Sequence, residues 1–503
     1  MAERDALSRG RGAERILYVP FDHLSFDHGV MRTADPVTDV VVLVESERML
    51  TGRPWHTERL FFLVSAARHF AAEAESRGFA VRYLRAPTTI DGLTDALTDF
   101  GNLPVTCAEP SSFRQHRALT EFGVEIIPND LFLTARDDFH AWASRQKSFV
   151  MENFYRAQRV RLGILVDGEG KPEQGRWNFD AENRLPPPKN YEWPARLAHE
   201  RDAMDLEVAA QLQHTPTDTW ATTRAGALAQ LDHFIEHNLA GFGPYEDAIS
   251  NDDWSLHHSL LSPYLNVGLL HASEVVEAVL AAFRAGRAPI ESVEAFVRQV
   301  IGWREYINGM YWYLGEDYRN LNGLNADRPL LPVFADSSAT KMACVGGVVA
   351  DVKKRGWVHH IPRLMVLSNL ALITGTNPQA FLDWMREQFV DAADWVMVPN
   401  IIGMGVHADG GLLMTKPYAS GGAYLNRMTQ YCKGCAYDPK KRSGDDACPF
   451  TTLYWDFLDR HRETFARNHR MAQQVNGLNR LSDLPQLRER AREVLTGLDA
   501  GLI

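Results

Sequence analysis

The chain has 503 residues, which is more than one compact core usually holds, so two or more domains are expected. With 45% hydrophobic and 23% charged residues and a net charge of -11, its composition is typical of a globular protein and excludes one that coats nucleic acid by bulk charge. No apolar run is long enough for a membrane span, the polar start lacks the apolar core of a secretory signal, and five cysteines are too few for a disulfide scaffold. We therefore expect a cytoplasmic protein.

The first 135 residues alternate short apolar runs with helical patterns. Between the second and third runs, apolar residues recur at helical spacing and predict a helix over 57–77. This β–α–β order predicts a doubly wound parallel sheet, whose ligands bind at the carboxyl ends of the strands. Because the first strand runs into FDHLS (21–25) and not into a GxGxxG turn, a standard dinucleotide site is not expected there. The predicted strands are 15–20, 39–45, 80–85, 104–108 and 124–128.

Residues 136–225 form a less regular region, with glycines over 168–175 and prolines over 186–188, and we interpret it as a connector. A basic stretch over 136–161 is most simply a solvated helix face. From 226 onward, strand patterns nearly vanish and helical spacing dominates. The predicted architecture is an α/β domain over 1–135, a connector over 136–225 and a large all-α domain over 226–503, without an internal repeat.

Four of the five cysteines have the spacing of metal-centre ligands. Cys432 and Cys435 form a C-x2-C pair in a polar loop, Cys448 follows directly before a proline, and Cys344 lies upstream. Four thiolates can close either a structural zinc site or an iron–sulfur cluster. Both alternatives are open at this point, although the Cys-Pro pair, the distant fourth cysteine and the aromatic surroundings favour iron–sulfur. Cys107 lies in a predicted strand and is interpreted as a buried apolar residue.

Helical segments of the all-α region carry polar and aromatic residues on shared faces. Such residues recur at helical spacing over 293–314 and over 378–395, and HHIPR (359–363) lies between them. A further piece, 257–264, opens a helix with serines, and free backbone N–H groups at a helix start can hold a pyrophosphate. Each feature alone is more often core packing, a structural histidine pair or a helix cap. Together they favour a large planar ligand.

These segments carry a resemblance to a known family. The chain resembles the photolyase/cryptochrome family, and more closely its bacterial iron–sulfur branch, which includes prokaryotic (6-4) photolyases. The matching segments keep their order and span nearly the whole chain beyond its N-terminal tail. They are RWNFDAENR (176–184), HHSLLSPYLNVGLL (257–270), RQVIGWREY (298–306), HHIPRLM (359–365), VPNIIGMG (398–405), DGGLLMTKPYASGGAYLNRM (409–428) and YCKGCAYDPKKRSGDDACPF (431–450).

The resemblance implies three cofactors: a noncovalent FAD in the all-α domain, a [4Fe-4S] cluster and an antenna chromophore in the α/β domain, often 6,7-dimethyl-8-ribityllumazine in this family. The implied cluster ligands are Cys344, Cys432, Cys435 and Cys448. The implied antenna contacts are Asp22, His23, Leu24 and Glu45.

The resemblance also implies which residues hold the flavin. An Arg363–Asp391 ion pair against the flavin ring is expected, because it would stabilise a reduced, anionic flavin. The implied FAD contacts are His258, Ser259, Leu260, Leu261, Ser262, Gln299, Trp303, Glu305, Arg363, Asp391 and Asn400.

The activity that the resemblance implies is light-driven repair of a (6-4) pyrimidine–pyrimidone lesion that is flipped out of duplex DNA. Excited reduced FAD would donate an electron to the lesion, and flipping a poorly stacked, damaged base costs less than flipping a sound one. His360, supported by His359, is the expected proton donor, a task for which a pKa near neutrality is suited. UV-damaged DNA is the expected partner of a monomeric protein, with Tyr418, Tyr424 and the basic residues over 145–161 as DNA contacts.

Several positions depart from the family pattern. Flavin photoreduction in the family runs along Trp and Tyr residues, of which Trp384 and Tyr424 are present. Met385 and Asp336 stand where close relatives carry aromatic residues, and electron hopping needs an oxidisable ring. In the α/β domain, FDHLS replaces the GDQLS of relatives and Met49 replaces an acidic residue, so the identity and presence of the antenna are open.

Three other functions compete with (6-4) repair. They are a cryptochrome-like blue-light photoreceptor with the same cofactors, a photolyase for cyclobutane pyrimidine dimers, and a non-photochemical nucleic-acid-binding protein whose cysteines form a metal module. The interrupted aromatic chain and the acidic composition are compatible with the photoreceptor. The pair of His359 and His360 favours repair, because a sensor needs no proton donor at a lesion.

Overall fold

The computed structural model describes residues 12–503, so the first eleven residues of the polar start lie outside the described part. Five parallel strands form one sheet in the order β3-β2-β1-β4-β5. Each strand ends within two residues of its predicted bounds, which confirms the parallel sheet expected from the β–α–β order. The strands are β1 (Arg15–Tyr18), β2 (Asp39–Ser46), β3 (Ala80–Ala86), β4 (Val105–Ala108) and β5 (Glu125–Ile127).

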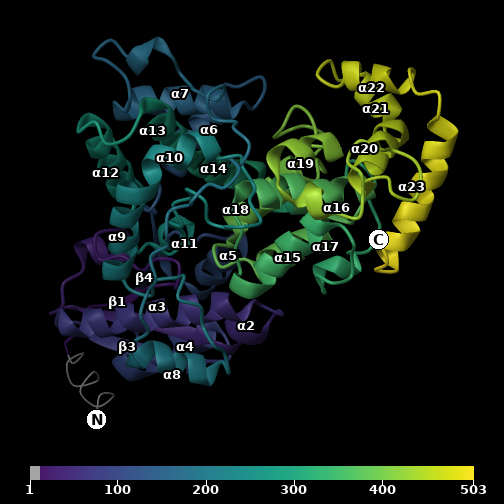
Figure 1. The fold of residues 1–503 in the computed structure, drawn as a ribbon. Helices are drawn as coiled ribbons and strands as arrows, with labels where there is room; N and C mark the ends of the chain where they lie inside the picture. Colours follow the sequence, from purple (N-terminus) through teal and green to yellow (C-terminus); the bar gives the residue numbers. More distant parts are fainter. Residues whose placement is uncertain (1–11) are drawn as a thin grey trace.

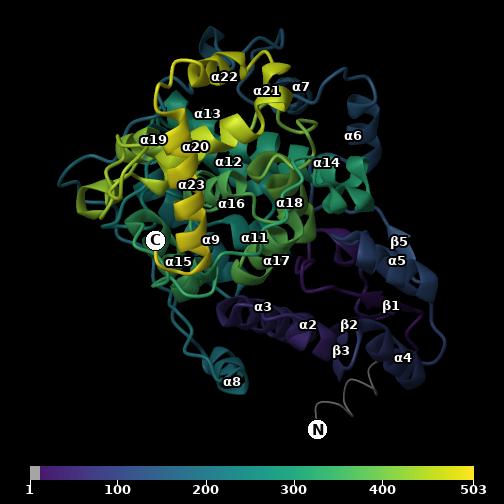
Figure 2. The same ribbon diagram turned by 90° about the vertical axis from the view of Figure 1, so that its right-hand side faces the viewer.

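Both faces of the sheet are covered, as the sequence of β2 shows. Every residue of β2 is buried, and its side chains alternate between two cores. Val40 and Val42 lie in the core with α4 (Thr89–Phe100) and α5 (Phe113–Phe122), whereas Val41 and Leu43 lie in the core with α3 (Thr57–Ser76). The helix predicted over 57–77 is thus confirmed. The α3 core continues into later helices, so α3 lies between the sheet and the helical body (Figures 1 and 2).

Beyond β5 the described chain contains no further strand and is dominated by helices. No described helix is both long and apolar enough to cross a membrane. The helices of this body are α9 (Arg224–His233), α10 (Leu239–Tyr245), α11 (Ser262–Val267), α12 (Ala272–Arg284), α13 (Ile290–Val297), α14 (Glu305–Leu314), α15 (Ala343–Arg355), α16 (Asn369–Thr374), α17 (Pro378–Gln388), α18 (Asp394–Val398), α19 (Gly422–Met428), α20 (Pro449–Arg460), α21 (Arg462–Ala466), α22 (Ala472–Leu478) and α23 (Leu484–Asp499). Shorter turns are η1 (Gly29–Thr33), α2 (Glu47–Thr51), η2 (Glu173–Gly175), η3 (Phe234–Asn238), η5 (Glu316–Asn320), η6 (Pro332–Phe334) and η9 (Tyr431–Gly434).

The segment interpreted as a connector is partly helical, and its first two helices, α6 (Arg136–Ala143) and α7 (Met151–Leu162), pack into the helical body. The rings of Phe139 and Phe154 lie 6.1 and 5.8 Å from the ring of Tyr306, centroid to centroid. Gly309 permits this approach, because a Cβ at that position would lie 2.1 Å from the Phe139 ring. By packing, α6 and α7 therefore belong to the helical body.

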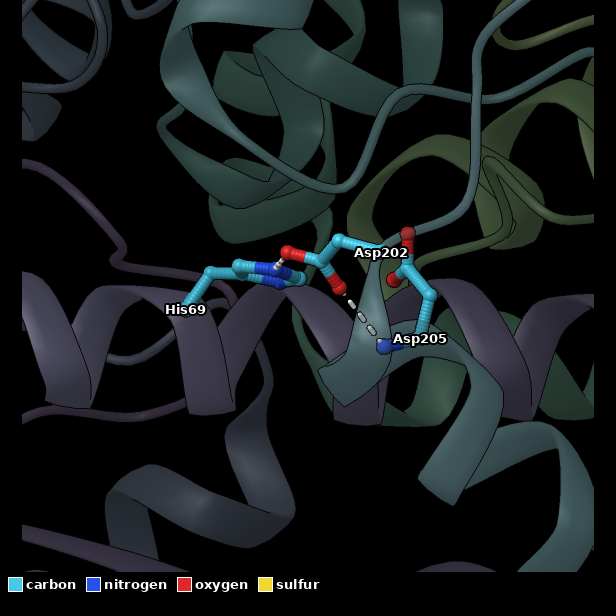
Figure 3. Close-up of side chains that lie close together, drawn as sticks. All are labelled: His69, Asp202 and Asp205. Atoms are coloured by element: carbon cyan, nitrogen blue, oxygen red, sulfur yellow. Dashed lines mark hydrogen bonds and ion pairs between the residues drawn. The ribbon is translucent and has the colours of Figure 1, made fainter.

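The third connector helix, α8 (Ala203–Gln211), docks on α3 through a polar cluster at its start (Figure 3). Asp202 caps α8 by accepting from the Asp205 N–H at 2.9 Å, and its other oxygen lies 2.8 Å from His69 Nε2 on α3. The buried Asp205 carboxylate accepts from Thr222 Oγ1 at 3.2 Å. The His69 contact holds the start of α8 against α3, and the Thr222 contact ties α8 to the chain that precedes α9.

Candidate functional site

Three segments of the expected flavin pocket are π-helical turns. Gln299 and Trp303 lie in η4 (Arg298–Arg304), Arg363 in η7 (Pro362–Ser368) and Asn400 in η8 (Pro399–Gly405). A π turn re-aims side chains and is frequent at functional sites. η7 and η8 each start at a proline, which lacks the N–H that an ordinary helical turn uses. These four side chains keep accessible surface among mostly buried neighbours.

The expected ion pair between Arg363 and Asp391 is present. Arg363 Nη1 donates to Asp391 Oδ1 and Nη2 donates to Oδ2, each at 2.9 Å, which is the strong two-point geometry. Ser262 Oγ donates to Asp391 Oδ2 at 2.7 Å, and Asn266 Nδ2 donates to the Asp391 carbonyl at 2.8 Å. Asn266 was not among the predicted residues, although its place four positions after Ser262, on the same helix face, is a signal that could have found it.

Aromatic rings enclose the Arg363 guanidinium. Its Cζ lies 4.2 Å from the ring centroid of Phe389 and 5.7 Å from that of Trp357. Trp384 packs next to Phe389 at 6.2 Å, and its indole N–H donates to the Phe334 carbonyl at 2.9 Å. The ring of Phe389 therefore contacts both the predicted electron carrier Trp384 and Arg363 of the ion pair.

The stretch before α11 has an anchored and an accessible side. Leu260 has a φ of 58°, an uncommon conformation for a residue with a side chain. Gln230 Nε2 donates to the Ser259 carbonyl at 3.1 Å. Leu260 and Leu261 are buried, whereas Ser259 and Ser262 keep accessible surface. The leucines thus anchor a stretch whose serines remain able to bind a ligand.

Three histidines gather near Arg363. His258 and His359 stack with ring centroids 4.0 Å apart, and His258 Nε2 and both ring nitrogens of His359 lack a hydrogen-bond partner of good geometry. Burial lowers the pKa of His258 to about 3, and it holds the pKa of His359 well below its ordinary value. Burial and the Arg363 guanidinium lower the pKa of His360 to about 4, below the near-neutral value that suits a proton donor, and the role of His360 stays a prediction. The His360 ring nevertheless keeps solvent-accessible surface, so a ligand can reach it.

Two of the residues implied as flavin contacts form hydrogen bonds with other parts of the protein. The buried Glu305 carboxylate accepts from the Thr134 N–H at 2.8 Å and from Arg304 Nη1 at 3.0 Å. Asn400 Nδ2 donates to the Val396 carbonyl at 2.8 Å. Glu305 thereby links the helical body to the chain that follows β5, and flavin contact by either residue stays a prediction.

The four predicted cluster ligands are free cysteines that line one cavity. Cys344 comes from α15, Cys432 from η9, Cys435 from just after it, and Cys448 from the residue that precedes α20. Burial raises the pKa of Cys344 and Cys448, and it raises the pKa of Cys432 to about 11. Within residues 12–503, no three of these sulfurs lie within 4.8 Å of one another. The four thiols therefore share one cavity, where a positively charged centre would have to ionise them.

Glu45, an implied antenna contact, is buried at the carboxyl end of β2, where three residues donate hydrogen bonds to it and Arg85 Nε lies 3.4 Å from its Oε1. Arg68 Nη2 donates to its Oε2 at 3.0 Å, the Tyr83 hydroxyl to Oε2 at 2.7 Å, and Gln211 Nε2 to Oε1 at 3.1 Å. Burial favours a higher pKa for Glu45, but these hydrogen bonds outweigh it and lower the pKa. Gln211 comes from α8, and no local sequence signal links it to Glu45.

The other implied antenna residues follow β1 and lie against the helical body. The Leu24 N–H donates to the Val267 carbonyl at 2.7 Å, and His23 Nε2 lies 3.3 Å from Asn129 Nδ2. His23 is buried and its Nδ1 lacks a partner, whereas Asp22 is partly exposed. The loop therefore lies at the junction of sheet and helices, with one imidazole nitrogen unsatisfied.

Several arginines of the basic stretch over 136–161 bind groups of the protein itself. Arg136 pairs with Glu109 at 2.6 Å, and Arg156 pairs with Glu152 at 2.9 Å. Arg159 is buried and donates to the Trp177 carbonyl at 2.8 Å. This stretch is therefore not a continuous free basic face. The other predicted DNA contacts, Tyr418 and Tyr424, are both partly exposed.

A family model and a full-length relative match the sequence. The model of a family described as deoxyribodipyrimidine photo-lyase-related protein matches residues 17–226. A (6-4) photolyase of Agrobacterium fabrum is 40% identical over 509 aligned residues, which cover 96% of this chain and 100% of that protein.

Two solved structures have a similar fold. The structure of a bacterial class III photolyase from Agrobacterium tumefaciens has a TM-score of 0.59 at 16% identity, covering 90% of this chain and 98% of the other. A Synechocystis sp. PCC6803 cryptochrome has a TM-score of 0.54 at 13% identity, with 78% and 83% covered. At these identities the two likenesses concern the fold alone.

Proposed function

The chain belongs to the photolyase/cryptochrome family, and we propose that it is a (6-4) DNA photolyase, which uses light to repair (6-4) pyrimidine–pyrimidone lesions. One structural observation carries the proposal: solvent-accessible His360, with His258 and His359 nearby, lies close to the Arg363–Asp391 pair. This arrangement combines a group that can exchange protons with a cation that can hold an anionic cofactor.

We assign FAD to the site around Arg363. The donor set fits it: Ser259 and Ser262 present hydroxyls at the start of α11, and His258 Nε2 is a buried nitrogen without a partner. FAD, when bound, supplies the electron that the lesion receives after light is absorbed. Arg363 holds negative charge in place, and Asp391 fixes the orientation of Arg363 through both carboxylate oxygens.

His360 is the proposed proton donor. Its pKa of about 4 makes the imidazole neutral at pH 7, because burial and Arg363 both oppose its cation. Negative charge from bound DNA would offset part of the Arg363 charge and so favour a higher pKa for His360. A protonated His360 could then donate its proton to the lesion. His359 supports the cluster by packing on His258.

A [4Fe-4S] cluster is the proposed occupant of the cysteine cavity. Cys344, Cys432, Cys435 and Cys448 line that cavity together, and four thiolates can hold either a zinc ion or an iron–sulfur cluster. The resemblance of the chain to the iron–sulfur branch of its family favours the cluster. None of the five cysteines, all of which lie in the described residues, forms a disulfide, which is typical of a reducing compartment. We therefore place the protein in the cytoplasm.

The proposed route for electrons into the site runs through Trp384, which lies beside Phe389 and so beside Arg363. Met385 is buried next to it and offers no oxidisable ring, and Asp336 is an exposed residue that accepts from the Ser338 N–H. Tyr424 on α19 is the second proposed carrier. Beyond Trp384, the route must therefore differ from an all-aromatic chain through positions 385 and 336.

An antenna such as 6,7-dimethyl-8-ribityllumazine is proposed for the carboxyl ends of β1 and β2. The unsatisfied His23 Nδ1 and partly exposed Asp22 support a polar ligand there, with the Leu24 backbone beside them. Glu45 contributes only if a ligand replaces one of its present donors.

The function is tested with an oligonucleotide that carries one (6-4) lesion, incubated with the reduced protein in blue light and in darkness and then analysed by chromatography. Light-dependent recovery of intact thymines is expected. No recovery by protein shown to hold reduced FAD contradicts the proposal, and recovery from a cyclobutane dimer instead reassigns the lesion. His360→Ala should keep FAD and DNA binding but lose repair, whereas the exposed His237→Ala should repair like the wild type. Repair by His360→Ala at the wild-type rate would refute the role of His360.

The cluster is tested by iron and sulfide analysis of Cys435→Ser. The variant should lose iron and soluble yield together, because the centre ties η9 to α15 and α20. Cys107→Ser is the matched control, since Cys107 is buried in β4, within the α/β core. An unchanged iron–sulfur absorbance in Cys435→Ser would overturn the assignment of that ligand.

A further inference from the structure

Two stretches of the C-terminal half contain no acidic residue, although the chain has 64 Asp and Glu among 503 residues, about one in eight. The stretches are 410–437 and 464–482, and each contains three Lys or Arg residues. In a chain with a net charge of -11, such stretches concentrate positive charge locally. The cations are Lys416, Arg427 and Lys433 in the first stretch and Arg467, Arg470 and Arg480 in the second.

The structure joins the two stretches at Thr415. Arg470 Nη1 donates to Thr415 Oγ1 at 2.8 Å, and Asn468 Nδ2 donates to the Thr415 carbonyl at 2.7 Å. Lys416 is the next residue, and Arg467 and Arg470 are exposed in the turn between α21 and α22. In the described part of the chain, none of these three cations pairs with an acidic side chain. Both views show α19, α21 and α22 in the upper part of the helical body (Figures 1 and 2).

Hydrogen bonds tie the segment that carries Thr415 and Lys416 to the helix that carries Arg363. The Ser420 N–H donates to Asn369 Oδ1 at 3.1 Å, and Asn369 Nδ2 donates to the Ser420 carbonyl at 2.9 Å. Asn369 begins α16, which continues directly from η7 and its Arg363. The basic turn is therefore connected to the proposed repair site through residues 415–420.

We propose that Lys416, Arg467 and Arg470 form a binding site for DNA backbone phosphates next to the lesion. The choice of DNA rests on the proposed function, whereas the phosphate chemistry rests on three unpaired cations in one place. The basic stretch over 136–161 is the weaker candidate, because Arg136 and Arg156 pair with carboxylates and Arg159 is buried. Backbone phosphates suit a surface that must accept lesions in any sequence.

The test is the salt dependence of binding to a fluorescent duplex, measured by anisotropy with the cofactor-loaded protein. Each phosphate contact adds about 0.9 to the steepness of log affinity against log salt concentration. Arg467→Gln with Arg470→Gln should therefore flatten the slope by about 1.8 and weaken binding several-fold at low salt. Arg284→Gln with Arg287→Gln is the matched control, since both residues are exposed at the end of α12 and neither belongs to the proposed site. The control should leave the slope unchanged.

Two further readouts separate charge from folding. Arg470→Lys should retain most of the slope, because the charge stays while the guanidinium bond to Thr415 is altered. Arg467→Gln alone should keep the wild-type melting temperature and flatten the slope by about 0.9. A wild-type slope in the Arg467/Arg470 double variant, or an equal loss in the control, overturns the proposal.

The same experiment distinguishes failure of the site from failure of the function. If the wild type binds duplex DNA with the expected slope but repairs no lesion, the phosphate site stands and the proposed function falls. If the wild type repairs (6-4) lesions and the double variant binds and repairs like it at every salt concentration, the phosphate site falls alone.

Discussion

Asp391 in the helical body and Glu45 in the α/β domain are both buried carboxylates held by an arginine, yet their surroundings differ. Around Asp391 and its partner Arg363, three nitrogens of His258 and His359 lack partners, and the nearby serines keep accessible surface. Around Glu45, hydrogen-bond donors from α3, β3 and α8 occupy the carboxylate oxygens, and Arg85 adds an ion pair at 3.4 Å.

The difference indicates which of the two sites needs a ligand. A buried polar atom without a partner costs about 1–3 kcal/mol, so several in one place are retained most readily where a ligand later satisfies them. The Asp391 region fits that description, and the Glu45 region is complete within the protein. An antenna that reaches Glu45 would have to displace a donor such as Gln211.

The largest expected effect comes from Asp391→Asn, which leaves Arg363 without its counter-charge. Removing one partner of a buried pair typically costs about 3–5 kcal/mol of unfolding free energy, and the partial exposure of Arg363 puts this case near about 3 kcal/mol. Flavin retention should fall as well. Urea unfolding and flavin content measure both effects. Asp499→Asn, in a more exposed pair with Arg328, should cost about 0–1 kcal/mol. Equal losses of unfolding free energy in both variants would show that the buried pair of Asp391 matters no more for stability than an exposed pair.

A smaller effect concerns the pH dependence of stability. The folded pKa of His258 lies below its ordinary value of 6.5, at about 3. The unfolded chain therefore binds more protons below pH 6.5, and the folded state loses stability as the pH falls. His258→Gln should remove about 1.4 kcal/mol of that loss per pH unit, or about 2 kcal/mol at pH 5. Unfolding free energies at pH 7 and pH 5 test this. If the unfolding free energy falls equally in the variant and the wild type between pH 7 and pH 5, the pKa of His258 is ordinary.

The smallest expected effect is that of Glu45→Gln, about 1.5 kcal/mol at pH 7, because Arg68 keeps a second carboxylate partner in Glu207 and an acceptor oxygen remains for Tyr83. The pKa of Glu45 is lowered from 4.5, so its contribution is present above that pH and is lost as the pH falls through the folded pKa. The difference between variant and wild type should therefore shrink on acidification below pH 4.5. Glu207→Gln, an exposed neighbour of the same Arg68, should change little at any pH. If the stability difference between Glu45→Gln and the wild type grows as the pH falls, the pKa of Glu45 is not lowered in the folded protein.

Much of the candidate site could be expected from sequence. The four cysteines gather as their spacing predicts, and Arg363 meets Asp391 as the resemblance implies. Other contacts had no local signal: Gln211 reaches Glu45 from a connector helix, and Glu305 accepts from the Thr134 N–H. The difference arises because spacing along one helix or loop acts locally, whereas hydrogen bonds between distant segments depend on how whole elements pack.

By itself the sequence determined the strands of the sheet, the position of α3 and the helical character of the second half. Hydrophobic periodicity sets these features, and it acts within a few residues. Only the tertiary structure decided the protonation of His360 and the use of charge in the basic stretch. The pKa of His360 is lowered because packed protein on one side and the Arg363 guanidinium disfavour its cation, although the ring stays accessible, and Arg159 is buried because the chain after α7 folds back over it. Burial and electrostatics depend on neighbours from remote segments, and these are fixed only when the elements pack.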